Sequence, residues 1–140
     1  MAACVQFAAV EVGDSIPPLA KPAITRMQLA LFAGAGADHN PIHVDDELAR
    51  AGGLPGVIAH GMLDMAFLGQ LLTNWVPQKC IRALSARFVA MAFPGDVMTC
   101  TGRVVAKAVQ EGENRVELEL ALENQRGEKI QLGKATVVLP

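Results

Sequence analysis

The sequence predicts an α+β fold in which one long buried helix packs against a curved antiparallel sheet. From about His60 to Trp75 there is no proline and one charged residue, Asp64, and apolar residues occupy nearly every helical face. After Pro77 the pattern becomes an alternation of apolar and polar residues broken by turn sequences, which is typical of half-buried antiparallel strands. The 140 residues suit a single domain over residues 1–140, large enough to bury a core without disulfides or metal ions.

A first helix is predicted shortly after the N-terminal arm. Thr25 is followed three residues later by a glutamine, which is the capping-box pattern, so the helix is expected to begin at Arg26. Met27 and Leu31 are expected to face inward. Glycines up to Gly36 are expected to end the helix and to lead into a loop.

A short second helix follows that loop. Asp45 or Asp46 is placed to cap it, and the pair Gly52-Gly53 is expected to stop it. The arm before the first helix is expected to run extended through residues 21–24.

Four antiparallel strands are predicted in the rest of the chain. They span residues 80–91, 97–110, 115–123 and 130–139. Gly95 supplies the positive φ that the turn between the first two requires. In the last strand, Ile130 and Leu132 are apolar at even positions, whereas the later apolar residues occupy odd ones. This switch predicts a β-bulge at Gly133.

Composition argues against several partners and locations. A net charge of −2 argues against an obligate nucleic-acid partner. Cys4, Cys80 and Cys100 are odd in number and lack a C-x-x-C pair, which fits reduced thiols in a cytoplasm. No stretch is long enough to span a membrane, and the apolar start of the chain lacks the basic residues of a signal peptide. We therefore expect a cytoplasmic protein that binds neither nucleic acid nor a membrane.

The residue types best suited to chemistry gather in the stretch DHNPIH at positions 38–43. Pro41 forbids a regular helix and pushes the preceding residue towards extended geometry, so the stretch is expected to be a loop or tight turn. Asp38 and His43 lie five residues apart across this turn, so both side chains could point at one small volume. An imidazole beside a carboxylate can move a proton on or off a water molecule.

Two other interpretations of this stretch stay open at this point. Asp38 and Asn40 are typical turn residues, because their side chains bond to the nearby backbone. His39 and His43 have the i, i+4 spacing that binds zinc on a helix. Pro41 lies between these histidines and removes that geometry, so we expect no metal site.

The two motifs ADHNPIH at 37–43 and IAHGM at 58–62 together resemble the signature of the MaoC-like hot-dog hydratases and dehydratases. These include (R)-specific enoyl-CoA hydratases and 3-hydroxyacyl-ACP dehydratase subunits. The resemblance extends from Gly13 to the last strand. It implies a hot-dog fold, an acyl-CoA or acyl-ACP thioester as substrate, and a reaction that needs no cofactor.

The resemblance also implies roles for individual residues. Asp38 and His43 match the catalytic pair that activates the water, and Asn40 matches the amide that braces the loop beside the substrate. Gly61 matches the glycine whose N–H polarises the thioester carbonyl, a role that an N–H at a helix N-terminus suits. His60 is expected to be structural.

Substrate-binding residues are expected on the long helix as well. Met62, Ala66 and Gly69 are expected, with Asn40, to line the substrate site, and the small Ala66 and Gly69 to open a groove for the acyl chain. Two positions depart from the family pattern. Gly69 stands where some relatives carry a serine, and His39 where relatives often carry an apolar or aromatic residue.

The expected function is (R)-specific hydration of trans-2-enoyl thioesters, or the reverse dehydration, in fatty acid metabolism. The catalytic subunit of a heteromeric 3-hydroxyacyl-ACP dehydratase is an alternative, as is a non-catalytic module that binds acyl thioesters. A hot-dog thioesterase would need a carboxylate on the long helix, where Asp64 is the only candidate. A homodimer is expected, because an unpaired sheet edge favours pairing with a second subunit, and a heterodimer stays open.

Overall fold

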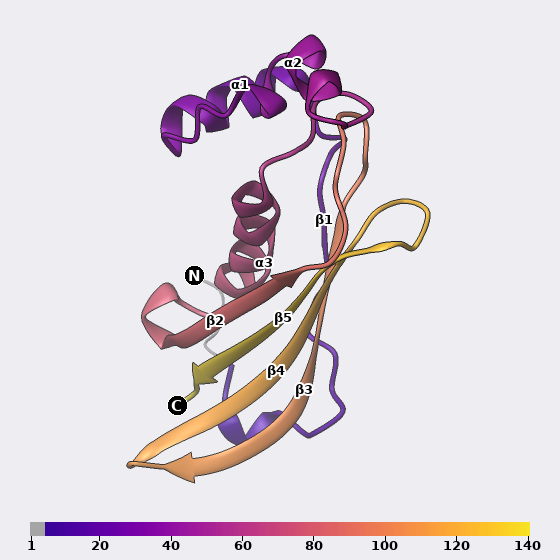
Figure 1. Ribbon diagram of the computed structural model, residues 1–140. Coiled ribbons are helices and arrows are strands. Elements are labelled where there is room, and N and C mark those ends of the chain that lie inside the picture. Colours follow the sequence, from indigo (N-terminus) through magenta and orange to yellow (C-terminus); the bar gives the residue numbers. More distant parts are fainter. Residues whose placement is uncertain (1–4) are drawn as a thin grey trace.

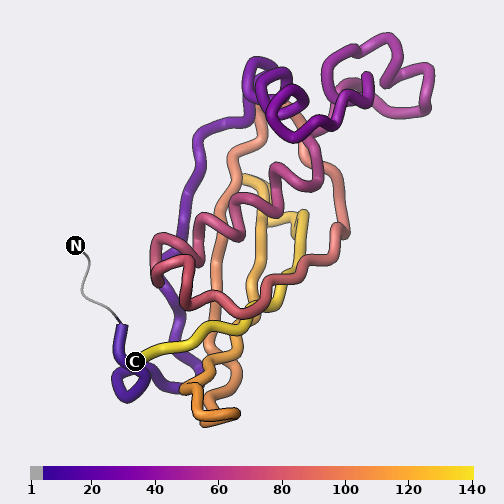
Figure 2. Tube along the Cα trace, turned by 90° about the vertical axis from the view of Figure 1, so that its left-hand side faces the viewer, coloured from indigo at the N-terminus to yellow at the C-terminus, as the bar shows by residue number. Residues whose placement is uncertain are grey.

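The computed structural model describes residues 5–140 and has the predicted α+β architecture, with one long helix packed on a curled antiparallel sheet (Figure 1). The helix, α3 (Gly61–Trp75), lies along one face of the sheet, and Figure 2, turned by 90°, shows its trace crossing the strands. His60 precedes the helix and Pro77 follows it closely, as predicted.

The sheet has five strands, all antiparallel to their neighbours. They are β1 (Leu19–Ala20), β2 (Ile81–Phe88), β3 (Thr99–Gln110), β4 (Glu113–Glu123) and β5 (Lys129–Val138). The four predicted strands are confirmed with shifted ends, and the arm adds the short β1, which pairs with β3. Three 3₁₀ turns complete the elements, η1 (Phe7–Ala9), η2 (Pro41–His43) and η3 (Gln78–Cys80).

The strand order β1-β3-β4-β5-β2 separates β2 from β3, its neighbour in sequence. β2 pairs instead with the last strand, so that Ala86 lies opposite Gly133 and Phe88 opposite Gln131. One long edge of β2 is therefore unpaired within the described chain. This edge lies beside α3, which also contacts β2.

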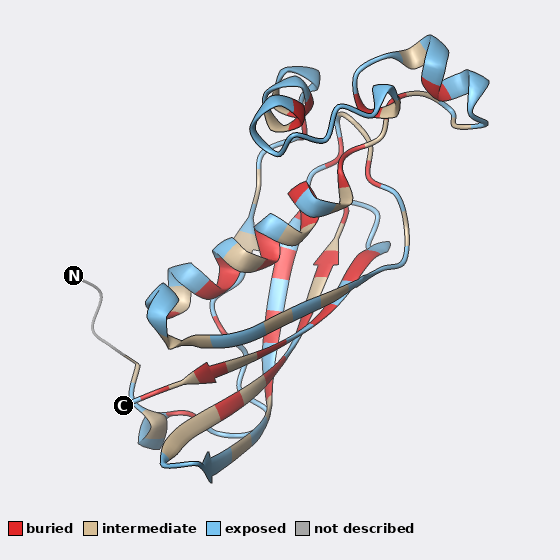
Figure 3. Cartoon of the chain, turned by 60° about the vertical axis from the view of Figure 1, so that its left-hand side comes forward, coloured by how far each residue is buried: buried red, intermediate tan, exposed pale blue. Residues whose placement is uncertain are grey.

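The composition of α3 had led us to expect burial on nearly every face. In the structure the helix is buried along one side only. Figure 3 shows the buried stretches of α3 in red. The buried apolar residues of α3 form the core with the inward face of the sheet, and they are Leu63, Phe67, Leu68, Leu71 and Leu72; Asp64 is buried beside them. Each buried leucine or phenylalanine contributes about 1.5–3 kcal/mol. The opposite side forms an exposed stripe of Met62, Ala66, Gln70 and Thr73. Two residues of this stripe, Met62 and Ala66, were predicted to touch substrate.

Helix α1 (Arg26–Ala35) begins where predicted, and Thr25 Oγ1 accepts a hydrogen bond from Gln28 N at 3.0 Å. The predicted inward face was wrong, because Met27 and Leu31 are 69% and 66% exposed whereas Leu29 and Ala33 are buried. The reason is the position of α1, which lies with α2 (Asp46–Ala51) at one end of the molecule, beyond the N-terminus of α3 (Figure 1). Only a narrow side of α1 reaches the core there.

The predicted bulge in β5 exists, but it lies at Ile130 and not at Gly133. Leu122 pairs with Gln131 and Glu123 pairs with Lys129, so Ile130 is the extra residue. Ile130 and Gln131 are consecutive buried residues, and Leu132, predicted inward, is exposed. The bulge was placed at the wrong residue because the prediction followed the apolar residues alone. Gln131, which is polar, occupies an inward position in the strand.

No helix within residues 5–140 is long and apolar enough to cross a lipid bilayer. Cys80 and Cys100 are free thiols, and burial raises the pKa of Cys100 to about 12. Cys4 lies outside the described residues.

Candidate active site

The loop at 38–43 is a tight structure that leaves one oxygen of Asp38 unused. Ala37 enters it with a φ of 53°, a left-handed conformation that non-glycine residues seldom adopt. Asp38 Oδ1 accepts a hydrogen bond from Asn40 N at 3.3 Å, and Asn40 Oδ1 accepts one from Ile42 N at 3.2 Å. Asn40 therefore caps η2 and braces the loop. Asp38 acts as a turn residue through Oδ1 and keeps Oδ2 for another partner.

That partner is His43, whose ring is buried beneath the loop. Its Nε2 lies 3.6 Å from Asp38 Oδ2, and its Nδ1 lies 2.7 Å from the Ile58 carbonyl oxygen. Because a carbonyl oxygen can only accept, Nδ1 must carry the proton, and in the neutral imidazole Nε2 then has a free lone pair. Ile58 N in turn donates to the Ile42 carbonyl oxygen at 3.1 Å, which ties the two motifs together. The predicted pair is thus brought together, with Nε2 facing the carboxylate.

His60 contacts both residues of this pair. Its ring stacks on the ring of His43 with centroids 3.8 Å apart, and its Nε2 donates to the Asp38 carbonyl oxygen at 3.3 Å. Burial, and secondarily the neighbouring His43, lower the pKa of His60, so the neutral ring is favoured. Phe32 of α1 packs against the other side of the ring, with centroids 4.9 Å apart. These contacts are those of a residue that holds Asp38 and His43 in place.

The histidine that joins the pair is thus His60 and not His39, which is exposed. Asp38, His43 and His60 each bring one ligand atom within 4.8 Å of the others, the one such cluster of potential metal ligands in the described part of the chain. The two rings are stacked with planes 23° apart, so their in-plane lone pairs run side by side and do not converge on one point. This geometry suits a water between Asp38 and His43 better than a metal ion.

Gly61, the first residue of α3, lies next to His60 in sequence. Within residues 5–140 no acceptor binds the N–H of Gly61 or that of Met62, which are among the first N–H groups of the helix. A side chain at Gly61 would meet the ring of Phe88, because an added Cβ would lie 2.6 Å from its Cδ2. The close approach of Phe88 is therefore a structural reason for glycine here. The carbonyl oxygen of Gly61 accepts a hydrogen bond from Gln131 Nε2 at 2.7 Å.

Gln131 is the residue that our sequence reasoning missed. It is 1% exposed in a mostly apolar core, and its amide reaches the first residue of α3. One signal was present in the sequence, since a glutamine stands at the point where the apolar alternation of the last strand breaks. We interpreted that break as a bulge alone, although a polar side chain facing inward also indicates a polar partner in the core.

A groove lies between α3 and β2, where a groove for the acyl chain was predicted. It has a volume of about 500 Å³ and is lined by Ala66, Gly69, Gln70, Thr73, Gln78, Ile81 and Leu84. An added Cβ at Gly69 would be in ordinary contact with Leu84, so the position has room for a small side chain. Met62 is exposed and does not line this groove, and neither does Asn40, whose side chain is occupied in the loop.

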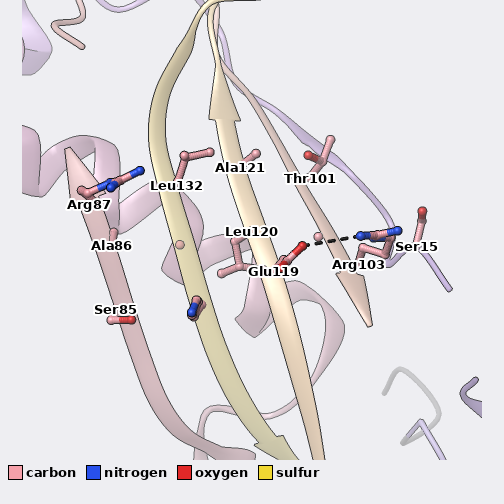
Figure 4. Close-up of a pocket in the computed structure, with 13 residues that line it drawn as sticks. Ser15, Ser85, Ala86, Arg87, Thr101, Arg103, Glu119, Leu120, Ala121 and Leu132 are labelled. Atoms are coloured by element: carbon pink, nitrogen blue, oxygen red, sulfur yellow. Dashed lines mark ion pairs between the residues drawn. The ribbon is translucent and has the colours of Figure 1, made fainter. Parts of the chain in front are cut away.

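A larger groove of about 880 Å³ lies on the other face of the sheet and holds none of the predicted site residues (Figure 4). Its charged side chains include Arg103 and Glu119, which form an ion pair at 3.5 Å. Glu119 also lies opposite Lys134 in the register of β4 and β5. The face away from α3 therefore carries charges of both signs and holds none of the residues predicted for the site.

Asp64, the only carboxylate of α3, is 2% exposed, and its Oδ1 has no partner within residues 5–140. Burial, and secondarily the charge of Asp96, raise the pKa of Asp64 to about 7. A carboxylate buried in this way is poorly placed to attack a thioester or to activate a water for hydrolysis.

Comparison with known proteins bears on the family and the fold of the chain. The family model that matches is described as a MaoC like domain, and it matches residues 8–125. The structure is similar to that of an unliganded R-hydratase from Pseudomonas aeruginosa, with a TM-score of 0.85 and 27% identity, over 98% of this chain and 86% of that chain. It is also similar to an (R)-hydratase from A. caviae involved in PHA biosynthesis, with a TM-score of 0.81 and 30% identity, over 94% and 98% of the two chains.

Among curated proteins, the chain is 37% identical over 75 residues to 3-hydroxyacyl-thioester dehydratase Z of Mycobacterium tuberculosis, which covers 53% of this chain and 50% of that protein. The chain spans half or less of the length of the curated relatives compared, from 3% to 50%. The fold is the hot-dog fold of these structural neighbours. Since the family model covers most of the chain, this protein belongs to the family of MaoC-like domain proteins.

Proposed function

We propose that this chain is a hydro-lyase that adds water to a trans-2-enoyl thioester to give the (R)-3-hydroxyacyl thioester, or catalyses the reverse dehydration. The observation that carries the proposal is the facing pair of Asp38 Oδ2 and His43 Nε2, 3.6 Å apart, on the loop before α3. The similarity to R-hydratases and to a 3-hydroxyacyl-thioester dehydratase supports the reaction class. The substrate is an acyl-CoA or acyl-ACP thioester.

The pair holds one water molecule and moves its proton. With Nδ1–H held by the Ile58 carbonyl, His43 Nε2 accepts a proton as the water oxygen attacks C3 of the enoyl chain. Asp38 Oδ2 orients the water and stabilises the imidazolium that forms. The same pair returns a proton to C2, so the reaction consumes one water and no net proton.

The start of α3 stabilises the negative charge that develops on the thioester oxygen. The Gly61 N–H has no acceptor in the described chain, and the helix dipole places partial positive charge at that end. A donor of this kind is worth about 10²–10³-fold in rate because it acts on charge that is largest in the transition state. No metal or redox cofactor has a step in this mechanism, since the thioester itself accepts the charge.

The acyl chain lies in the groove lined by Ala66 and Gly69. Ala66 is five residues beyond Gly61, which corresponds to about 7.5 Å along the helix axis. Short acyl chains therefore react at the loop without filling the groove, whereas longer chains extend into it.

The active form is a homodimer joined at the β2 edge. Within the described chain, β2 is a long strand with one unpaired edge. The apolar residues Phe88, at its end, and Val89 and Met91, just beyond it, are exposed. An exposed apolar edge of this kind favours pairing with another strand. A heteromer in which this chain is the catalytic subunit is the alternative assembly, and a cytoplasmic location stays a prediction.

The test is hydration of short and medium trans-2-enoyl-CoAs, followed by loss of the conjugated double bond. Asp38→Asn and His43→Gln are each expected to lower turnover by about 10²–10⁴-fold. The double variant should be scarcely slower than either single one, because the two groups act on one water. His39→Gln is the matched control, since His39 is exposed in the same loop and should keep wild-type turnover.

Each other outcome identifies an alternative. Release of free thiol would indicate a thioesterase, and activity only after a second protein is added would indicate a heteromer. Thermal melting must first show that the variants are folded. Folded Asp38→Asn and His43→Gln proteins that keep most of the hydration rate would refute the assignment of this loop as the active site.

A further inference from the structure

Gln131 is a buried amide whose bonding is incomplete. Its Nε2 donates to the Gly61 carbonyl oxygen at 2.7 Å, while its Oε1 has no partner within residues 5–140. The amide cannot be reversed, because Gly61 presents a carbonyl oxygen, which can only accept. A buried acceptor without a donor destabilises a core, so an apolar side chain would pack there at lower cost. The bond to Gly61 is what this glutamine adds.

The bulge in β5 places Gln131 for that bond. Ile130 is the extra residue, and its carbonyl oxygen accepts from Val89 N and Ala90 N at 3.0 and 3.3 Å. The strand therefore turns consecutive residues inward, and Gln131 takes the position opposite Phe88. Phe88 also packs on Gly61. Gln131 and Phe88 thus fix the first residue of α3 from the sheet.

The carbonyl of Gly61 and the N–H of Met62 belong to one peptide group. A hydrogen bond to the carbonyl fixes the plane of this peptide and hence the direction of the Met62 N–H. It also polarises the N–H, because hydrogen bonds in a chain strengthen one another. Gly61 and Met62 supply consecutive N–H groups, both without an acceptor in the described chain, and N–H groups in the first turn of a helix point outward along its axis.

We propose that Gln131 is a positioning residue that orients the Gly61–Met62 peptide, so that the Met62 N–H joins the Gly61 N–H as a second donor to the thioester oxygen. The inference rests on the proposed function and deepens it. Gln131 does not touch the substrate and acts through the peptide that it holds. Since the oxygen carries most charge in the transition state, the loss of this bond should lower kcat more than it raises KM.

Gln131→Met keeps the length of the side chain and removes the donor. We expect kcat for enoyl-CoA hydration to fall about 10–100-fold, with KM changed by less than about 3-fold. Val137→Ala is the matched control. Val137 is fully buried on the same face of β5, and its apolar side chain cannot form a hydrogen bond with Gly61. It should lower the melting temperature and leave kcat within about 2-fold.

Gln131→Glu provides a rescue that a packing role would not show. The protonated carboxyl of this variant can donate to the Gly61 carbonyl, whereas the ionised form repels it, so kcat should be near wild type at low pH and fall as pH rises. Asp38 and His43 are present in both proteins, so the ratio of variant to wild-type kcat at each pH reports the titration of the introduced Glu carboxyl alone.

A second readout does not depend on turnover. Saturated butyryl-CoA, isotopically labelled at the thioester carbonyl, is bound to the protein and its carbonyl stretch is measured by infrared difference spectroscopy. Hydrogen bonding lowers this frequency in the wild type, and Gln131→Met should move it back towards the value in water, while Val137→Ala should not. A lowered frequency in a wild type that hydrates nothing would refute the proposed function and leave this inference standing. An unaltered kcat and an unaltered frequency in folded Gln131→Met would overturn the inference alone, and a wild type without any lowered frequency would also overturn it.

Discussion

Replacing Asp64 with asparagine is expected to stabilise the protein at pH 8 and to leave its stability nearly unchanged at pH 4. The carboxyl of Asp64 is 2% exposed, and burial raises its pKa from 3.8 to about 7. Each pKa unit corresponds to about 1.4 kcal/mol, so ionising this group inside the folded protein costs on the order of 4 kcal/mol. Asparagine resembles the protonated carboxyl in size and carries no charge, so the expected gain is small at pH 4 and on the order of 4 kcal/mol at pH 8.

The sign of the pH dependence follows from proton uptake. Between about pH 4 and pH 7 the unfolded chain has lost the proton of Asp64 while the folded protein still holds it. Raising the pH through this window therefore favours the unfolded state, and the loss of stability is complete above the folded pKa of about 7. The gain of Asp64→Asn over wild type should grow from pH 4 to pH 7 and then stay level.

Urea unfolding of both proteins at several pH values between 4 and 8 measures this difference, and the difference cancels the titration of other groups. Asp45→Asn is the matched control, because Asp45 is an exposed cap of α2 that bonds Leu48 N at 3.0 Å and that asparagine can replace. It should stay within about 0.5 kcal/mol of wild type at every pH. A gain for Asp64→Asn that is the same at pH 4 and pH 8 would show that Asp64 is not a buried carboxyl with a raised pKa.

Three further outcomes are expected. Gly61→Ala and Phe88→Ala should each lower the melting temperature, and the double variant should melt close to Phe88→Ala alone, since the added Cβ then has room; additive losses would remove Phe88 as the reason for glycine. Gly69→Leu should lower hydration of medium-chain enoyl-CoAs by about 10-fold or more and leave the shortest substrate nearly unchanged, whereas an equal loss at all chain lengths would make the residue part of the packing. Light scattering at micromolar concentration should give the molar mass of a dimer. The double variant Ala83→Lys with Ser85→Lys, which places two positive charges on the exposed β2 edge, should give that of a monomer. A wild type that is monomeric at that concentration would contradict edge pairing.

Local chemistry in the sequence predicted most of the elements and the tight loop at 38–43. Thr25 and Asp45 cap the helices that follow them, and Pro41 breaks the chain into the turn that holds Asp38 and His43. These features depend on side chains bonding to backbone groups two to four residues away. Such contacts depend only on residues that are close together in the chain, so the sequence alone determined them.

The tertiary structure decided which faces are buried and which distant residues meet. Met27 and Leu31 are exposed because α1 lies at the end of the molecule, and β2 pairs with β5 across the sheet although β3 follows it in sequence. Gln131 reaches Gly61 from 70 positions along the chain. Burial and pairing of this kind depend on what the rest of the chain places opposite a residue. A local pattern carries no information about that partner. The sequence by itself therefore determined the helix caps and the loop. The contact of Gln131 with the first residue of α3 was decided only by the packing of the helix on the sheet.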